Sequence, residues 1–218
     1  MKSAKSVTEG YGGFPSGASL GGKVSQYRGK QTIYKQGDPA GTLYYIQTGG
    51  VRLTTQTKHQ TSAVTTILGA GELFGEVCLA GFPLRMSTAV ALTASSIRTV
   101  QKKEMIQMLH AKNNKAANVL VTYLLFSNQK YKEHVSDLLT STAEQRLARV
   151  LLMLSHLDEH GPPAAEIPFL SHQVLAEMVG TTRPRINLFM NRFRKLGFID
   201  YDGGLEVRQS LRKMLAEK

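Results

Sequence analysis

The segment 169–199, FLSHQVLAEMVGTTRPRINLFMNRFRKLGFI, constrains the fold of this chain more than any other part of its sequence. A helix is expected over 171–179, because Ser171 is a favourable capping residue at its start. Ala176 gives that helix a small side chain where a partner helix must come close. Gly180 then supplies the backbone freedom that a tight turn between two helices needs. This order predicts the first half of a helix–turn–helix.

A second helix is predicted directly after the turn. Thr181 or Thr182 can cap it, and Pro184 is tolerated in its first turn, where an N–H would lack a partner in any case. Gly197 stands where the helix is expected to stop. The residues that recur at helical spacing and predict its buried stripe are Ile186, Phe189 or Met190, and Phe193.

The remaining faces of this second helix are strongly basic. No acidic residue occurs between Thr181 and Lys195, and a basic helix in this motif predicts binding in the major groove of double-stranded DNA. A hairpin wing is expected next, with strands in FIDY and LEV around the turn residues 202–204. A helical hairpin that docks proteins is the alternative. The polar and basic residues of the second helix are Arg183, Arg185, Asn187, Asn191, Arg192, Arg194 and Lys195.

The composition fits a two-domain protein with a polyanionic partner. With 218 residues and a net charge of +11, the chain is long enough for two modest domains. Charge alone does not separate nucleic acid from an anionic membrane, but no apolar run approaches the roughly 18 residues of a membrane span, and no signal peptide is visible. The single cysteine, Cys78, cannot form an internal disulfide, so a cytoplasmic location is expected.

Residues 24–101 have the pattern of an all-β domain. Short β-branched or apolar segments alternate with turn signals (GDPAG, TGG, KHQTS and GAGE), which predicts a barrel or jelly roll. A helical pattern, KKEMIQMLH, follows from Lys102. The expected strands lie in TIYK, TLYYIQ, GVRLTTQ, AVTTIL, STAVAL and SSIRTV.

A longer helix is predicted over 116–139. One series of its residues alternates steps of three and four, which is typical of a helix that pairs with a copy of itself. A symmetric homodimer is therefore expected, because two helix–turn–helix units gain affinity and register from it. The alternative is a helix packed on its own β-domain. The predicted dimer residues are Leu120, Leu124, Ser127, Tyr131, Val135 and Leu138.

These patterns divide the chain into four parts and predict an α+β fold. The four parts are a flexible arm over 1–22, an antiparallel β-roll over 23–112, the dimerisation helix over 113–139, and a winged helix–turn–helix over 140–218. The last part opens with an amphipathic helix in TSTAEQRLARVLLMLSHL, followed by a loop with Gly161, Pro162 and Pro163.

The order of these parts resembles the Crp/Fnr family of bacterial transcription regulators. The similarity covers about residues 24–208 and is most specific in GELFGEVCLAG and in the helix–turn–helix segment. The resemblance implies a dimeric, promoter-binding sensor, for which RNA polymerase is a further candidate partner.

The cyclic-nucleotide binders of that family hold phosphate and ribose with a Gly-Glu turn and a later Arg-Ser or Arg-Thr pair. By resemblance Gly75 and Glu76, followed by Val77, match the turn, and Arg85 matches the arginine. Met86 replaces the hydroxyl residue, so a phosphate donor is missing and a weak or absent response to cyclic AMP is expected. The alternative is a β-roll corner in which Arg85 makes an ion pair, and the effector stays unknown.

The adenine-contacting Thr-Ser pair of cyclic-AMP binders has no clear match on the long helix. Asn128, Gln129 and Lys130 lie near the expected place.

The DNA-contacting residues also follow and depart from the family pattern. Arg183 matches a base-reading arginine, whereas Pro184 replaces a glutamate and Leu188 replaces a later arginine. Side-chain chemistry suggests guanine for Arg183, adenine for Asn187 and a thymine methyl for Leu188. The expected phosphate contacts are Arg185, Arg192, Lys195 and the hydroxyls of Ser171 or Thr182.

Other chemistries have little support in the sequence. One cysteine is too few for an iron–sulfur cluster, Cys78 lies in an apolar stretch that predicts inert burial, and His156 with His160 lacks a third metal ligand. No catalytic motif is found, so an enzyme is not expected. The alternative function is a signalling adaptor, with a degenerate cyclic-nucleotide module that binds proteins.

Overall fold

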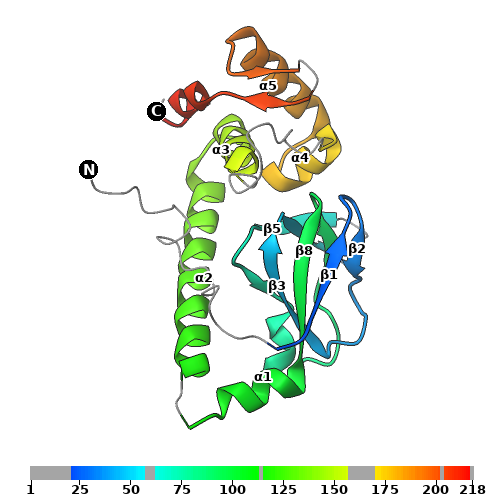
Figure 1. The fold of residues 1–218 in the computed structure, drawn as a ribbon. Helices are drawn as coiled ribbons and strands as arrows, with labels where there is room; N and C mark the ends of the chain where they lie inside the picture. The colour runs from blue at the N-terminus through cyan, green and yellow to red at the C-terminus, as the bar shows by residue number, and fades with distance from the viewer. Residues whose placement is uncertain (1–20, 57–61, 113–114, 157–169, 202–203, 217–218) are drawn as a thin grey trace, which may run out of the picture. The chain divides into compact units, whose positions relative to one another are not determined.

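The computed structural model describes residues 21–56, 62–112, 115–156, 170–201 and 204–216, which form two compact units (Figure 1). The first unit comprises Met1–Val51 and Leu68–His134, and the second comprises Arg52–Ile67 and Val135–Lys218. Most of the predicted N-terminal arm and of the KHQTS turn lies outside the described residues. The proline-containing loop and His160 lie outside them as well.

The β-domain consists of two four-stranded sheets, with strand orders β1-β8-β3-β6 and β2-β7-β4-β5. All six expected strands are confirmed, and two more were missed: β1, which pairs antiparallel with β8, and the short β6, which pairs with β3. The strands are β1 (Lys23–Tyr27), β2 (Thr32–Tyr34), β3 (Thr42–Thr48), β4 (Val51–Gln56), β5 (Ser62–Leu68), β6 (Leu73–Phe74), β7 (Thr88–Ala91) and β8 (Ser95–Gln101).

Strand β3 lies at the centre of its sheet and is buried on both faces. Leu43 and Tyr45 belong to a core cluster on one face. On the other face Tyr44 stacks on Phe74, with ring centroids 4.9 Å apart, and meets Tyr34 at 5.4 Å. A strand with apolar neighbours on both sides reads as a continuous hydrophobic run, as TLYYI does.

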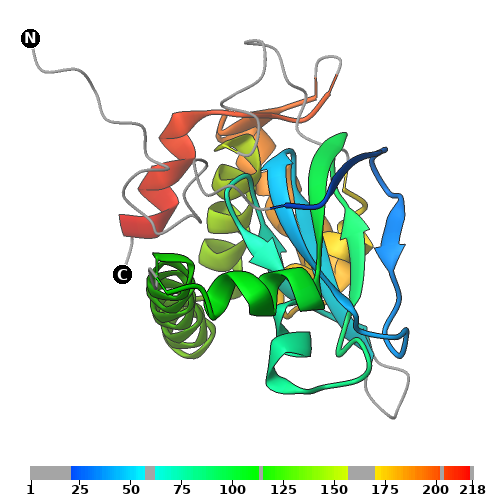
Figure 2. The ribbon, with the colours of Figure 1, turned by 60° about the horizontal axis from the view of Figure 1, so that its bottom comes forward.

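Three helical segments accompany these strands: the 3-10 helix η2 (Glu76–Ala80), α1 (Lys102–Leu109) and the long α2 (Lys115–Thr140). The Gln101 and Glu104 side chains form a capping box at the start of α1, which explains why the helix begins where β8 ends. Figure 2, in which α2 is seen nearly end-on, shows α1 leading from the strands to α2.

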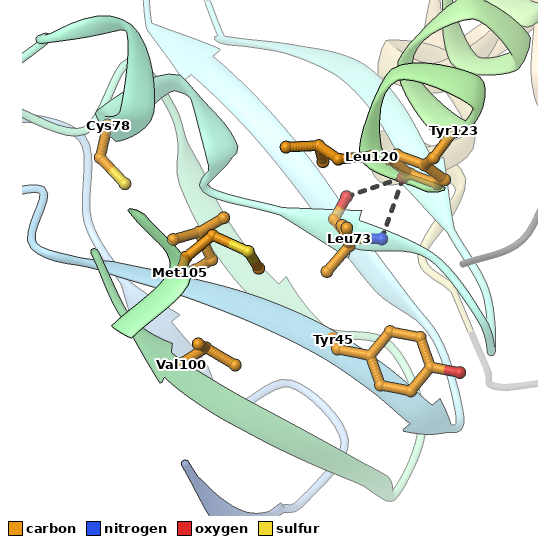
Figure 3. Close-up of a cluster of buried hydrophobic side chains, with 8 residues drawn as sticks. Tyr45, Leu73, Cys78, Val100, Met105, Leu120 and Tyr123 are labelled. Carbon is orange, nitrogen blue, oxygen red and sulfur yellow. Dashed lines mark hydrogen bonds between the residues drawn. The ribbon is translucent and has the colours of Figure 1, made fainter. Parts of the chain in front are cut away.

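Two polar contacts hold the first half of α2 on the β-roll. The Tyr123 hydroxyl donates to the Leu73 carbonyl at 3.0 Å and accepts from the Leu73 N–H at 2.9 Å (Figure 3). One heptad later, the Lys130 ammonium lies 2.5 Å from a Glu72 carboxylate oxygen. These contacts fix which face of α2 is turned toward the roll.

That orientation corrects the predicted dimer residues. Leu120 is 6% exposed and belongs to the core cluster with Leu73, Met105 and Tyr123, so it is buried within a single chain. Ser127 lies on the same face and contributes a hydrogen bond to the Tyr123 hydroxyl. Leu120 and Ser127 therefore face the roll, whereas the other members of the predicted series stay exposed in the single chain.

The second unit contains the expected winged helix–turn–helix. The helices α3 (Ala143–His156), α4 (His172–Val179) and α5 (Arg183–Lys195) confirm the prediction, whereas the wing strands β9 (Ile199–Asp200) and β10 (Glu206–Val207) are shorter than expected. The C-terminal segments η3 (Gln209–Arg212) and α6 (Lys213–Ala216) were not predicted. Their buried Leu211 and Met214 add to the core of this unit.

We predict that Tyr123→Phe destabilises the β-roll. The substitution removes both hydrogen bonds to Leu73 and leaves a buried N–H and carbonyl without their partner, which costs about 1–3 kcal/mol. Urea unfolding followed by circular dichroism measures this loss. Tyr27→Phe, at a half-exposed tyrosine of β1, is the matched control and should change the unfolding free energy little; equal losses in the two variants would contradict the prediction.

Candidate functional sites

The turn between α4 and α5 has the geometry that its sequence predicts. The Ser171 hydroxyl caps α4 by accepting from the Val174 N–H at 3.3 Å, and Gly180 ends the helix in the left-handed region at φ 68°. Ala176 is 2% exposed, so its small side chain lies in the packed core of this unit. The turn therefore sets the angle between α4 and α5 through local chemistry.

Helix α5 divides cleanly into a buried and an exposed face. Ile186, Phe189, Met190 and Phe193 are all buried, which confirms the predicted stripe. At 3.6 residues per turn the face opposite them is made by Pro184, Leu188, Asn191 and Lys195. Leu188 is 66% exposed, an unusual place for a large apolar side chain on a basic helix.

The start of α5 is open to an anion. Thr182 occupies the N-cap position, but its side chain makes no capping hydrogen bond, so the predicted cap is not formed there. Pro184 lies in the first turn and has no N–H to offer a cap. The Thr182 hydroxyl is thus available as one of the expected phosphate contacts, beside backbone N–H groups at a helix N-terminus.

Arg192, an expected phosphate contact, has a partner within the unit. Its guanidinium Nη1 donates to both Glu144 carboxylate oxygens, at 2.8 and 3.1 Å, and Glu144 is only 15% exposed. The helical periodicity puts residue 192 on the side of α5 that faces α3. By contrast, Arg183 and Lys195 are exposed and form no hydrogen bond or ion pair within the part of the chain that the structure describes.

Two other predicted DNA contacts have partners inside the unit. The Arg185 guanidinium lies 5.7 Å from the centre of the Phe189 ring, one turn further along α5. The Asn187 carbonyl oxygen is hydrogen-bonded to Nδ1 of His172, the first residue of α4. Sequence reasoning did not find His172, because the contact joins residues on two helices.

The wing is a two-stranded antiparallel hairpin in which Glu206 pairs with Asp200 and Val207 with Ile199. Arg208 supports it through an ion pair to Asp200 at 3.7 Å. The predicted turn residues Asp202 and Gly203 lie outside the described residues.

The predicted effector corner is built around a buried arginine. Arg85 is 5% exposed, and its Nη1 donates to the Thr42 carbonyl at 2.8 Å and to the Gly75 carbonyl at 3.4 Å. Its Nη2 donates to the Thr42 hydroxyl at 2.6 Å. The Tyr34 and Tyr44 rings lie 4.3 and 5.2 Å from the guanidinium carbon. Both terminal nitrogens of Arg85 are therefore already hydrogen-bonded within the protein, whereas Nε has no partner in the described structure.

This geometry differs from the alternative considered for Arg85, an ion pair at a β-roll corner. No carboxylate of the described residues forms an ion pair with it; carbonyls, a hydroxyl and two aromatic faces solvate the charge instead. Burial raises the pKa of Tyr34 to about 12 and keeps that ring neutral. None of these partners was identified from the sequence, because Thr42 and Tyr44 are more than forty residues from Arg85.

Of the other predicted effector residues, Gly75 and Glu76 interact with Arg85. Gly75 has φ 76°, and a Cβ atom there would lie 2.6 Å from Arg85 Nη1, so this position needs glycine. Burial raises the pKa of the adjacent Glu76 carboxyl, and the Arg85 charge opposes that shift. Val77 and Met86 are 38% and 55% exposed, and neither side chain can donate a hydrogen bond.

The candidate adenine contacts on α2 also have protein partners. Lys130 pairs with Glu72, and Gln129 donates to Glu133 one turn later. Asn128 is exposed. Of these three residues near the expected adenine position, Gln129 and Lys130 are thus bound within the protein.

The outward face of α2 is strongly apolar. Its large hydrophobic side chains remain 41–81% exposed in the single chain, which is more apolar surface than a solvated helix carries. These residues are Val121, Leu124, Leu125, Tyr131, Val135, Leu138 and Leu139; Phe126 is exposed as well but lies on another side of the helix.

The described residues contain neither an exposed thiol nor a cluster of metal ligands. Cys78 is 1% exposed, and burial raises the pKa of its thiol, so it has the character of a core residue. No group of three His, Cys, Asp or Glu residues in the described ranges could hold a metal ion. No described helix combines the length and the apolar character that crossing a bilayer requires.

Comparisons with known proteins match both units. Residues 24–112 fit the family model of the cyclic nucleotide-binding domain, and residues 145–215 fit that of the Crp-like helix-turn-helix domain. The chain is similar to the cyclic AMP receptor protein of Thermus thermophilus, with 28% identity over 82% of this chain and 80% of the relative. It is also similar to the cAMP-activated global transcriptional regulator CRP of Haemophilus influenzae, with 26% identity over 83% and 81%.

A solved structure shows the same fold. It is a Crp-family transcriptional regulator from Thermus thermophilus, which superposes with a TM-score of 0.73 at 22% identity and covers 88% of this chain and 97% of that one.

Proposed function

Because the chain belongs to the Crp/Fnr family of transcription regulators, we propose that it is a homodimeric regulator that reads DNA with α5. The observation that carries the proposal is the exposed, basic surface of α5: Arg183 at its start and Lys195 at its end have no protein partner in the described structure, and the helix N-terminus is open. Such a face suits phosphates at its edges and base edges at its centre. As a regulator of transcription it would also contact RNA polymerase, and nothing in its site suggests catalysis.

The side chains of α5 divide into base-reading and phosphate-binding groups. We assign Arg183 to a guanine and Asn187 to an adenine, because both lie in the first two turns of the helix that enters the groove. The exposed Leu188 is suited to a thymine methyl. The phosphate contacts we propose are Arg185, Lys195, Ser171 and Thr182, with Asn191 on the same exposed face.

We predict different losses for Arg183→Ala and Lys195→Ala. The first should lower the preference for one base pair by about 1–3 kcal/mol, whereas the second should weaken all sequences equally and reduce the slope of log K against log salt by about 1. Fluorescence anisotropy on duplexes selected from a random pool, repeated at several salt concentrations, measures both.

Two variants provide the controls for this experiment. Arg28→Ala removes an equal charge from the β-domain and should change neither quantity. Arg192→Ala should affect stability more than sequence preference, because it breaks the pair with Glu144. Unchanged DNA affinity in the Arg183 and Lys195 variants would favour the adaptor that docks proteins.

The dimer surface that we propose is the outward apolar face of α2. The earlier candidates Leu124, Tyr131, Val135 and Leu138 remain in it, whereas Leu120 and Ser127 leave it. A second copy would bury these side chains, and each Å² of apolar surface removed from water would stabilise the dimer by about 25 cal/mol. Two copies of α5 could then meet successive major grooves.

We predict that Leu125→Glu dissociates the dimer. Leu125 is 67% exposed in one chain, so the variant should fold as a monomer but place an unpaired charge in the interface. Analytical ultracentrifugation should show at least about a tenfold rise in the dimer dissociation constant. Val24→Glu, at an exposed valine of β1, is the control; a wild-type protein that sediments as a monomer at micromolar concentration would refute the proposed dimer.

We further propose that cyclic AMP is not the physiological effector. The relatives named above are described as cAMP-activated or as cyclic AMP receptors, but here Arg85 is already bound by Thr42 and Gly75. A phosphate would have to displace charge-assisted hydrogen bonds, each of which is worth about 1.5–3 kcal/mol. Met86 offers no hydroxyl in return.

We expect isothermal titration calorimetry to detect no cyclic-AMP binding tighter than millimolar in the wild type. Met86→Ser restores the missing hydroxyl and should improve the affinity only slightly, because the Arg85 contacts remain. Micromolar binding by the wild type, coupled to a rise in DNA affinity, would contradict this part of the proposal.

A further inference from the structure

A hydrogen bond between the two helices of the helix–turn–helix reaches one of the base-reading candidates. Nδ1 of His172 contacts the Asn187 carbonyl oxygen. His172 is the first residue of α4 and is partly buried, whereas Asn187 is exposed in the second turn of α5. The capping bond from Val174 to Ser171 fixes the start of α4 and therefore the position of the histidine.

We propose that His172 is a positioning residue that determines base specificity through Asn187. The inference rests on the proposed function, in which α5 enters the major groove. In the tautomer with hydrogen on Nδ1, and in the imidazolium form, the ring donates to the amide oxygen. A flipped Asn187 amide would then oppose two donors, so the contact determines which end of the amide is held against α4.

The bound amide keeps the groups that read adenine. Its oxygen has a second lone pair, and both hydrogens of its nitrogen remain free. An asparagine recognises adenine by accepting from N6 and donating to N7 in one plane. A side chain that is already held loses less conformational entropy on binding, which sharpens the difference between the correct and the wrong base.

Few side chains near Asn187 are free to contact a base. Arg183 lies one turn before Asn187 on the same side of α5, and Arg192 is paired with Glu144 on the other side. Arg183 and Asn187 therefore lie on one side of α5, and His172 touches Asn187.

The experiment compares base preferences of full-length variants. The wild type first selects its site from a random duplex pool, and the position read by Asn187 is the one whose preference is lost in Asn187→Ala. Binding to duplexes with each base pair at that position is then measured for His172→Phe, His172→Gln, His110→Ala and the double variant His172→Phe/Asn187→Ala. Phe keeps a ring without a donor, Gln keeps an N–H donor, and His110, exposed after α1, controls for loss of a histidine.

We expect an adenine preference of about 5- to 150-fold in the wild type. His172→Phe should lose at least threefold of it at this position only, with an unchanged salt slope. His172→Gln should recover part of the preference, His110→Ala should keep it, and the double variant should match Asn187→Ala, as coupled residues do.

Three results would overturn the inference. The first is that His172→Phe keeps the adenine preference of the wild type. The second is that His172→Phe changes the base preference at positions other than the one read by Asn187. The third is that the losses of preference in the two single variants multiply in the double variant. A wild type that selects no sequence at all would instead remove the proposed function, so the two failures are distinguishable.

Discussion

One guanidinium holds together the unit that presents α5. Arg146, in α3, donates from Nε to the Val179 carbonyl at 2.8 Å and from Nη1 to the Ser141 and Leu138 carbonyls at 2.6 and 3.4 Å. Carbonyls at helix ends have no intrahelical partner, and a cation there also complements the helix dipole. A single arginine thus satisfies the C-terminal ends of both α2 and α4. The bond to Val179 adds a contact from α3 to the residue that precedes the turn at Gly180.

Other polar contacts fix the two halves of α2 separately. The last turns of α2 carry part of the proposed dimer surface, and Arg149 adds an ion pair to Asp137 there at 2.6 Å. The first half of the same helix is held on the β-roll through Tyr123 and Lys130.

Local sequence determines much of this protein, and distant contacts determine the rest. The buried stripe of α5, the left-handed Gly180 and six strands could be predicted, because periodicity and turn chemistry act within a few residues. The partners of Arg85, Arg192 and Tyr123 could not, because they lie 43, 48 and 50 residues away. The pattern in α2 showed the same limit: spacing indicated that a face is apolar, but only the bonds to Leu73 decided that Leu120 faces the roll.

The cationic side chains discussed above differ in whether protein groups already bind them. Arg85 and Arg146 are bound by backbone carbonyls, and Arg192 is bound by a carboxylate, so each would lose good hydrogen bonds if a ligand took it. Arg183 and Lys195 have no such partners in the described structure and lose only water when a phosphate or base binds. The net charge of +11 therefore overstates the surface available to a polyanion. In the proposed function the cations that DNA would meet lie on α5, whereas Arg85 in the β-roll corner is already bound by neutral groups of the protein.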